Sequence, residues 1–261
     1  MIRGWLSRLR AQREQRIVQR RAISNEMWLE TLASLPFLAR WSAADLEALR
    51  RLTSLFLDEK EFAGAGGLEV TDAMAVRIAV QACLPVLRLG LQPYRGFVGI
   101  VVHPDEVVAA REVMDDDGVV HNYDEVLSGE AMEGGPLMLS WTDVHAAGDS
   151  ADWAYNVVIH EFAHVIDMGD GEPDGVPPLQ STELRQRWRA VIEAEYEAFC
   201  RWCDAGRDTV LDPYGATEVG EFFAVAVEAF FVASSDMRDE HPALYALFAG
   251  YFQQDPAALG A

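Results

Sequence analysis

The chain has 261 residues, of which half are apolar, and it carries a formal net charge of −21 with a mean hydropathy near zero. This length and apolar content suffice for a large hydrophobic core, in one domain with or without a helical appendage. The negative charge argues against a nucleic-acid-binding surface over most of the molecule, and no apolar run is long enough to span a membrane.

Positive charge is concentrated at the start of the chain. Residues 1–22 contain seven arginines and one glutamate, Glu14, a balance of +6 that leaves −27 for the remainder. Apolar residues interleave with these arginines, so residues 5–22 could form a basic amphipathic helix on an anionic surface. We favour the alternative, a frayed arm that neutralises part of the acidic body. The chain is accordingly divided into a basic arm, residues 1–25, and a single domain, residues 26–261.

Three cysteines, Cys83, Cys200 and Cys203, do not make a disulfide framework, and an odd number suits a reducing compartment. Cys200 and Cys203 form a C-x-x-C pair, which we interpret as incidental because it lies inside a predicted helix without a second such pair. The N-terminal segment lacks the uninterrupted apolar run of a secretory signal. We therefore expect a cytoplasmic protein.

The first third of the chain is predicted to be mostly helical. Apolar residues recur at helical spacing over residues 26–57, and Ser42 is a candidate N-cap inside this stretch. Residues 60–62 predict a short strand. Thr71 then begins a helix that Pro85 ends. This part of the chain predicts a packing layer without visible chemistry.

Two short apolar stretches, residues 97–102 and 137–141, predict buried strands. Between them, Asp115–Asp117 predict a solvated turn, because no EF-hand spacing supports a cation site. The second strand is a candidate edge to which a substrate peptide could add. Strands and helices occur without βαβ alternation, so the predicted fold class is α+β.

The last part of the chain predicts further helices. The first of them has Asp149 or Ser150 as a candidate cap, and Gly169 follows its end. The other helices are predicted to begin at Ser181 or Thr182, at Thr217 and at Pro242.

The first of these helices contains the pattern H-E-x-x-H over His160–His164. Residues four apart lie on one helix face with Cβ atoms about 5–6 Å apart, so both imidazoles can bind one zinc ion. Glu161 is rotated by about 100° from His160, which suits a general base on a zinc-activated water better than a third ligand. We favour this interpretation over two ordinary histidines and a solvated glutamate, because burying these groups in an apolar helix without partners is costly.

A hydrolytic zinc site needs a third protein ligand and one open position. The metzincin arrangement is excluded, because no H-x-x-G-x-x-H extension follows His160–His164. Candidate ligands on the helix predicted to begin at residue 217 are Glu218, Glu221 and Glu228. Glu221 lies where the sequence turns apolar and can reach a buried site. Glu228, two turns on, can orient a ligand histidine, whereas Glu218 suits the dipole of the exposed first turn.

Asp167 lies one turn beyond His164, near the C-terminal end of the same helix. A carboxylate there is unfavourable for the helix dipole, so we expect a specific partner. The candidate partner is the second N–H of a ligand imidazole, and a solvated carboxylate is the alternative.

The pattern His160-Glu161-Phe162-Ala163-His164-x-x-Asp167, followed by Tyr214 and by Glu221–Phe231, resembles the Mlc titration factor A family of zinc metallopeptidases. The resemblance runs from about residue 26 to about residue 256. The active-site helices also resemble those of the anthrax lethal factor protease domain. There a tyrosine precedes the glutamate ligand by seven residues, as Tyr214 precedes Glu221 in this chain.

The resemblance implies a zincin-like metallopeptidase fold, rich in helices, with a small mixed sheet and one Zn²⁺ per chain. It implies His160, His164 and Glu221 as zinc ligands, Glu161 as the base and Tyr214 as a hydroxyl donor to the oxyanion. It also implies aminopeptidase-type activity on a peptide or protein substrate. The family's named member binds the transcriptional repressor Mlc, so the alternative function is a regulatory protein that sequesters a transcription factor, with a mainly structural zinc site.

Overall fold

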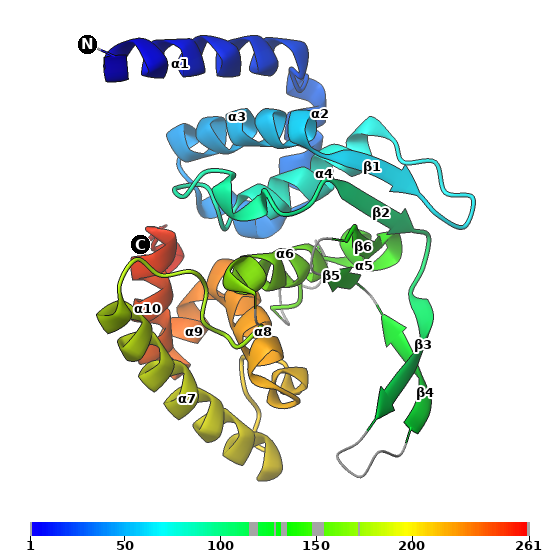
Figure 1. The fold of residues 1–261 in the computed structure, drawn as a ribbon, viewed down its shortest axis with the longest axis vertical. Helices are drawn as coiled ribbons and strands as arrows, with labels where there is room; N and C mark the ends of the chain where they lie inside the picture. Colours follow the sequence, from blue (N-terminus) through cyan, green and yellow to red (C-terminus); the bar gives the residue numbers. More distant parts are fainter. Residues whose placement is uncertain are drawn as a thin grey trace.

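The computed structural model describes residues 2–114, 120–127, 129–131, 135–147, 154–171 and 173–259. These residues form a helix-rich α+β structure in which N-terminal helices lie above a small sheet and C-terminal helices lie below it (Figure 1). Among the described residues, no helix combines the length and the apolar character needed to cross a lipid bilayer.

The N-terminal layer consists of four helices: α1 (Ile2–Arg20), α2 (Asn25–Ala33), α3 (Ala43–Glu59) and α4 (Asp72–Cys83). The predicted N-caps of α3 and α4 are confirmed. The side chain of Ser42 accepts a hydrogen bond from the backbone N–H of Asp45, and that of Thr71 accepts one from Met74. The helix α4 is nearly all buried and lies directly against the centre of the molecule.

Residues 2–20 form a helix, which differs from the frayed arm that we favoured from the sequence. The helix lies along α3 (Figure 1), and charged side chains join the two. Arg51 of α3 donates a hydrogen bond to Glu14 at 2.6 Å, and Arg20 donates one to Asp58 at 2.6 Å. The arginines therefore neutralise acidic groups of the body, as expected, but from a helical segment.

The main sheet has the strand order β1-β2-β6-β5, with strands β1 (Glu61–Gly64), β2 (Gly99–His103), β5 (Gly129–Ala131) and β6 (Leu137–Ser140). The strands β1, β2 and β6 are parallel to one another, and β5 runs antiparallel to β6. The prediction that residues 137–141 form an edge is wrong, because β6 pairs on both sides and β5 is the edge strand of the described sheet. A three-residue strand is too short to reveal itself by alternation of apolar and polar residues.

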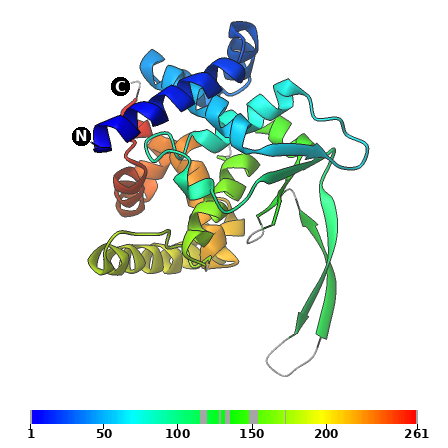
Figure 2. The same ribbon diagram turned by 45° about the horizontal axis from the view of Figure 1, so that its top comes forward.

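Two further strands, β3 (Val107–Met114) and β4 (Val120–Leu127), form an antiparallel hairpin that extends away from the body (Figure 2). The sequence did not predict them, because the apolar run of β3 covers only residues 107–110 and β4 mixes apolar with polar and charged residues. The predicted turn at Asp115–Asp117 lies outside the described residues.

The C-terminal part consists of α5 (Trp141–Ala146), α6 (Val157–Asp167), α7 (Thr182–Asp204), α8 (Val219–Val232), α9 (Ser234–Glu240) and α10 (Pro242–Phe252). The helix α6 is central: it packs against α8, α4 and β5 (Figure 1). Nearly every residue of α8 is buried, so its few polar side chains face other buried elements rather than solvent.

Two predicted helix caps differ from the structure. The cap of α6 is Asn156, whose side chain accepts a hydrogen bond from the backbone N–H of Ile159, and Asp149 and Ser150 lie outside the described residues. Thr217 does not cap α8; its hydroxyl donates to the carbonyl oxygen of Tyr214 at 2.8 Å. Gly169 does follow the end of α6, as predicted, but it lies in a short 3-10 turn, and the glycine with a left-handed backbone is Gly171 (φ 113°).

Candidate metal centre

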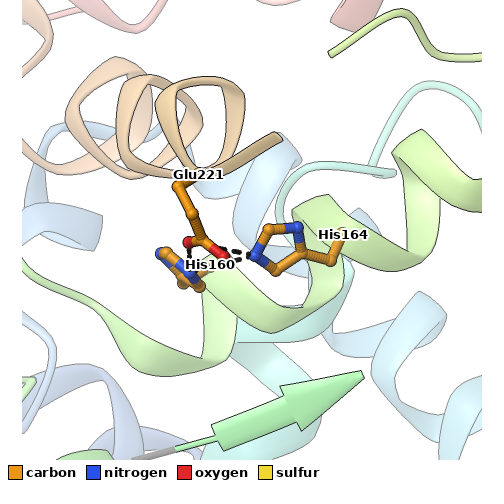
Figure 3. Close-up of side chains that lie close together, drawn as sticks. All are labelled: His160, His164 and Glu221. Carbon is orange, nitrogen blue, oxygen red and sulfur yellow. Dashed lines mark hydrogen bonds and ion pairs between the residues drawn. The ribbon is translucent and has the colours of Figure 1, made fainter. Parts of the chain in front are cut away.

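The facing surfaces of α6 and α8 bring His160, His164 and Glu221 together (Figure 3). Nε2 of His160 lies 3.0 Å from Oε2 of Glu221 and 3.1 Å from Nε2 of His164. Oε2 of Glu221 lies 3.4 Å from Nε2 of His164. The three side chains are only 12–15 % exposed, so their donor atoms meet in a largely buried place that still has access to solvent.

This donor set fits a zinc ion. Tetrahedral zinc with bonds of about 2.0–2.1 Å requires donor atoms roughly 3.3 Å apart, and the three measured separations are 3.0, 3.1 and 3.4 Å. Two imidazoles and one carboxylate are a ligand set of hydrolytic zinc enzymes, which leaves one coordination position open. Two imidazole nitrogens this close together, beside a carboxylate, are typical of a site that binds a cation.

Glu228 lies behind His160 and is only 3 % exposed. Its Oε1 is 2.7 Å from Nδ1 of His160, and its Oε2 accepts a hydrogen bond from the backbone N–H of Asn156. A carboxylate accepts, so Nδ1 donates its proton to Glu228, and Nε2, on the side of Glu221, is the ring nitrogen left to bind a cation. Burial raises the pKa of Glu228, and the His160 N–H keeps the carboxylate hydrogen-bonded.

Glu221 differs from Glu228 in its contacts and in its charge state. Burial alone would raise the pKa of Glu221, but hydrogen bonds to His160 and His164 outweigh it and hold this pKa well below its usual range. Glu221 is therefore ionised, as a metal ligand must be. The third candidate of the sequence, Glu218, is exposed at the N-cap position of α8.

Asn156 and Gln81 are functional residues that sequence reasoning missed. The side chain of Asn156 caps α6, and its Nδ2 donates a hydrogen bond to Oε1 of Gln81 on α4 at 2.8 Å. Both residues are fully buried. A signal was present: asparagine directly before a buried apolar helix is a favoured N-cap, and Gln81 is a lone amide in an apolar stretch. The pair fixes the start of α6 and therefore the position of His160, one turn later.

Glu161 lies beside the centre, 5 % exposed, on the side of α6 that faces β5. It is packed so closely against Gly129 that a β-carbon at residue 129 would lie 2.5 Å from its Cγ and Oε1. Burial raises the pKa of Glu161 to about 6, although the two histidines oppose this effect. A carboxylate with a raised pKa near neutral pH suits a proton acceptor.

Tyr214 lies in a 3-10 turn, Pro213–Ala216, which precedes α8. Its ring centroid is 6.3 Å from that of His160, and the side chain is 49 % exposed. Two hydrogen bonds hold the turn: Asp212 accepts from the backbone N–H of Tyr214 at 2.8 Å, and the Tyr196 hydroxyl donates to the carbonyl oxygen of Ala216 at 3.2 Å. The tyrosine is thus brought to the solvent-facing side of the centre.

Asp167 does not contact the centre, and the predicted hydrogen bond to an imidazole is wrong. Among the described residues, neither histidine is hydrogen-bonded to it. Its Oδ2 instead accepts a hydrogen bond from the backbone N–H of Gly175 at 2.8 Å. Gly175 has a left-handed backbone (φ 74°), which only a glycine adopts readily. Asp167 therefore ties the end of α6 to the loop that follows it.

The chain is similar to known proteins over most of its length. The family model described as glucose-regulated metallo-peptidase M90 matches residues 9–253. The chain is 38% identical over 226 residues to the uncharacterized protein slr2042 of Synechocystis sp., covering 85% of this chain and 81% of that protein. It is 35% identical over 234 residues to Mlc titration factor A of Klebsiella pneumoniae, covering 88% and 87%. It is 36% identical over 232 residues to Mlc titration factor A of Edwardsiella ictaluri, with the same coverage.

Proposed function

The chain belongs to the glucose-regulated metallo-peptidase M90 family, and from this premise we propose that it is a zinc-dependent peptidase with the site on α6 and α8. The observation that carries the proposal is the convergence of His160, His164 and Glu221 beside the buried carboxylate of Glu161. We propose these three residues as ligands of one zinc ion per chain. The packing of α6 against α8 beside a mixed sheet supports a zincin-like fold.

Bound zinc supplies a Lewis acid that polarises a peptide carbonyl and lowers the pKa of a water molecule toward about 7. Glu161 takes the proton of the attacking water and passes it to the leaving amine; its burial and raised pKa support this role. Tyr214 donates a hydrogen bond to the developing oxyanion, a role supported by its place next to His160. Glu228 keeps the His160 ring in the orientation and tautomer that binding requires.

We propose a peptide or protein substrate and aminopeptidase-type cleavage, the latter resting on the family resemblance alone. The cytoplasm is the proposed location, since the three cysteines are free thiols in the structure. A peptide with a free amino end should be cleaved, and the same peptide with an acetylated amino end should be cleaved far more slowly. Equal rates would exclude the aminopeptidase assignment and leave the peptidase assignment intact.

The direct test of the peptidase proposal is the substitution Glu161→Gln. The variant should bind zinc as the wild type does, because Glu161 is not among the proposed ligands, and its hydrolysis of peptides should fall about 100-fold or more. The matched control is Glu218→Gln, the same chemical change at the exposed N-cap position of α8, which should leave both properties unchanged. Undiminished turnover in Glu161→Gln would exclude Glu161 as the base.

A regulatory function is the second proposal, and the relatives named Mlc titration factor A favour it because they match over most of their own length. In this proposal the chain sequesters a transcriptional repressor of the Mlc type, and the zinc ion has a mainly structural role. Immobilised protein should then capture a purified repressor of this type, and Glu161→Gln should capture it equally well. Absence of capture by either form would remove the proposal.

A further inference from the structure

A cavity of about 1120 Å³ lies at the C-terminal end of α6, the helix that carries His160 and His164. Its walls are the C-terminal end of α6, the loop of residues 89–97, the start of α7 and one face of α10. The lining is mostly apolar, with Leu137, Val165, Trp188, Leu247 and Tyr251 among its residues. Its size is that of a ligand site, and it exceeds what one side chain fills.

The cavity and the centre share two elements, α6 and β5. On α6, Val165 lines the cavity and directly follows the proposed ligand His164. On β5, Ala131 lines the cavity, while Gly129 of the same strand packs against Glu161. Two residues of a strand span about 7 Å. An extended peptide that adds to this edge strand at Glu161 therefore reaches the cavity with its next one or two residues.

One wall of the cavity is held in place by a buried lysine. Nζ of Lys60 donates hydrogen bonds to the carbonyl oxygens of Tyr94 and Phe97, and its ammonium lies 3.7 Å from the centroid of the Phe97 ring. Tyr94 also ties the loop of residues 89–97 to the core. Its side chain is buried, and its hydroxyl donates a hydrogen bond to the carbonyl oxygen of Ala82. The cavity is therefore preformed, which lowers the entropic cost of binding.

The charge of the lining is opposite to that of the protein. The chain has 42 acidic and 21 basic residues, yet among the residues that the structure describes the lining contains Arg95 and Arg187 and no aspartate or glutamate. Within the described structure neither arginine has an ion-pair partner. The arginines on either side of Arg187 on α7 do form ion pairs: Arg185 pairs with Asp170 at 2.7 Å, and Arg189 pairs with Asp174. Two uncompensated guanidinium groups beside an apolar cavity favour a ligand that combines an apolar group with a carboxylate.

We propose that this cavity is a specificity pocket of the peptidase site, which selects substrate segments where a large apolar side chain is followed or preceded by an acidic one. The apolar side chain enters between Val165 and Trp188, and the neighbouring carboxylate binds Arg95 and Arg187. The proposal rests on the proposed function, because the occupant is a substrate peptide. The pocket proposal goes beyond the proposed function, because it names the chemical class of the substrate.

The test measures binding separately from cleavage. Two hexapeptides, Ala-Leu-Glu-Leu-Glu-Ala and Ala-Leu-Lys-Leu-Lys-Ala, each with a C-terminal fluorophore, are titrated with zinc-loaded Glu161→Gln protein, and anisotropy gives the dissociation constants. The Glu peptide should bind about 10-fold or more tighter at low salt, as expected for two charge pairs. In the same background, Arg95→Glu with Arg187→Glu should reverse the preference, and Arg95→Gln with Arg187→Gln should abolish it.

The matched control is Arg13→Glu with Arg16→Glu, the same two charge reversals at exposed positions of α1 that do not line the cavity. It should leave the preference for the Glu peptide unchanged. A Glu peptide in which both leucines are replaced by serine should bind about 10-fold more weakly, since it has no group for the apolar walls. Equal affinity of the two original peptides, no binding of the Glu peptide, or an unchanged preference in the double variants would overturn the proposal.

Cleavage of the unlabelled peptides by the wild-type protein distinguishes this proposal from the proposed function. Binding preference without hydrolysis would contradict the peptidase assignment and leave the pocket assignment standing. Hydrolysis of both peptides with equal kcat/KM would contradict the pocket and leave the peptidase standing.

Discussion

Oε1 of Glu228 lies 2.7 Å from Nδ1 of His160, on the opposite edge of the ring from Glu221. The two glutamates are seven residues apart on α8, so they share one helix face and approach the same imidazole from its two nitrogens. Glu221 is positioned to share a cation with Nε2. Glu228 determines that Nδ1 carries the proton.

This division of roles predicts different losses of zinc for the two residues. Glu221→Ala should remove one of three ligands and abolish zinc binding at micromolar zinc. Glu228→Ala should weaken zinc binding about 10–100-fold, the usual effect of removing the partner of a ligand histidine. Zinc affinity is measured by competition with a chromogenic chelator. The reverse order of the two losses would overturn the ligand assignment.

Asn156→Ala should reduce both stability and zinc affinity. The substitution removes the N-cap of α6, which costs about 1 kcal/mol, and leaves the buried Oε1 of Gln81 without its donor, which adds about 1–3 kcal/mol. The start of α6 shifts as a result, and His160 with it. The measurements are urea unfolding of the metal-free protein and the chelator competition.

The control for this prediction is Ser24→Ala, which removes the N-cap of α2, where the Ser24 side chain accepts a hydrogen bond from Met27 at 3.1 Å. This variant should also lose about 1 kcal/mol of unfolding free energy. Because α2 carries none of the proposed ligands, its zinc affinity should equal that of the wild type. Equal zinc affinity in Asn156→Ala as well would show that the cap has only a structural role.

Gly129→Ala should impair hydrolysis more than zinc binding. A β-carbon at this position would lie 2.5 Å from Glu161, so either the carboxylate or the strand β5 must move. Glu161 is not among the proposed ligands, and the three atoms nearest to the added β-carbon all belong to Glu161. We expect kcat to fall about 10-fold or more, as for a displaced base, with zinc affinity within a factor of about three. Gly99→Ala on β2, where the added β-carbon would meet only Pro136, at 3.3 Å, is the matched control.

Local patterns predicted part of this site, and tertiary contacts determine the remainder. The spacing of His160 and His164 follows from the helical repeat, and the apolar surroundings of Glu221 indicated that its carboxylate could be buried. The predicted caps of α6, Asp149 and Ser150, precede the observed cap Asn156 by six residues or more. The sequence does not show how long the loop before the helix is. The partner of Asp167 was wrong for a related reason: Gly175 lies eight residues away, across a turn that helical spacing does not describe.

The fold shows the same limit. The strands β2 and β6 were predicted because each lies in a short apolar stretch of the sequence. The structure buries these stretches, with Ile100 and Leu137 fully enclosed. The edge strand β5 and the β3–β4 hairpin were not predicted, since neither has the continuous apolar character that marks a buried strand. The strand β5 pairs with β6, and β3 pairs with β4. Both pairings consist of backbone hydrogen bonds, which depend little on the type of amino acid.

The last prediction concerns pH and the buried carboxyl of Asp167. Burial raises its pKa from the ordinary value of 3.8 to about 7; the negative charge of Asp174 adds to this, and His164 and the Gly175 N–H oppose it. A raised pKa means that the folded state keeps the proton after the unfolded state has lost it. The contribution to stability is therefore complete below about pH 4, declines as pH rises, and is lost above about pH 7.

Asp167→Asn should remove this dependence, because the amide oxygen still accepts from Gly175 and carries no charge. The variant should gain about 1–4 kcal/mol relative to the wild type between pH 4 and pH 8, measured as the difference in unfolding free energy at each pH. Asp45→Asn is the control of opposite sign, since the hydrogen bond from Ser42 lowers the pKa of Asp45. Its stabilising effect is present at neutral pH and lost as pH falls, so this variant should be less stable than the wild type at pH 7. A flat difference between wild type and Asp167→Asn across this range would show that Asp167 is charged throughout it.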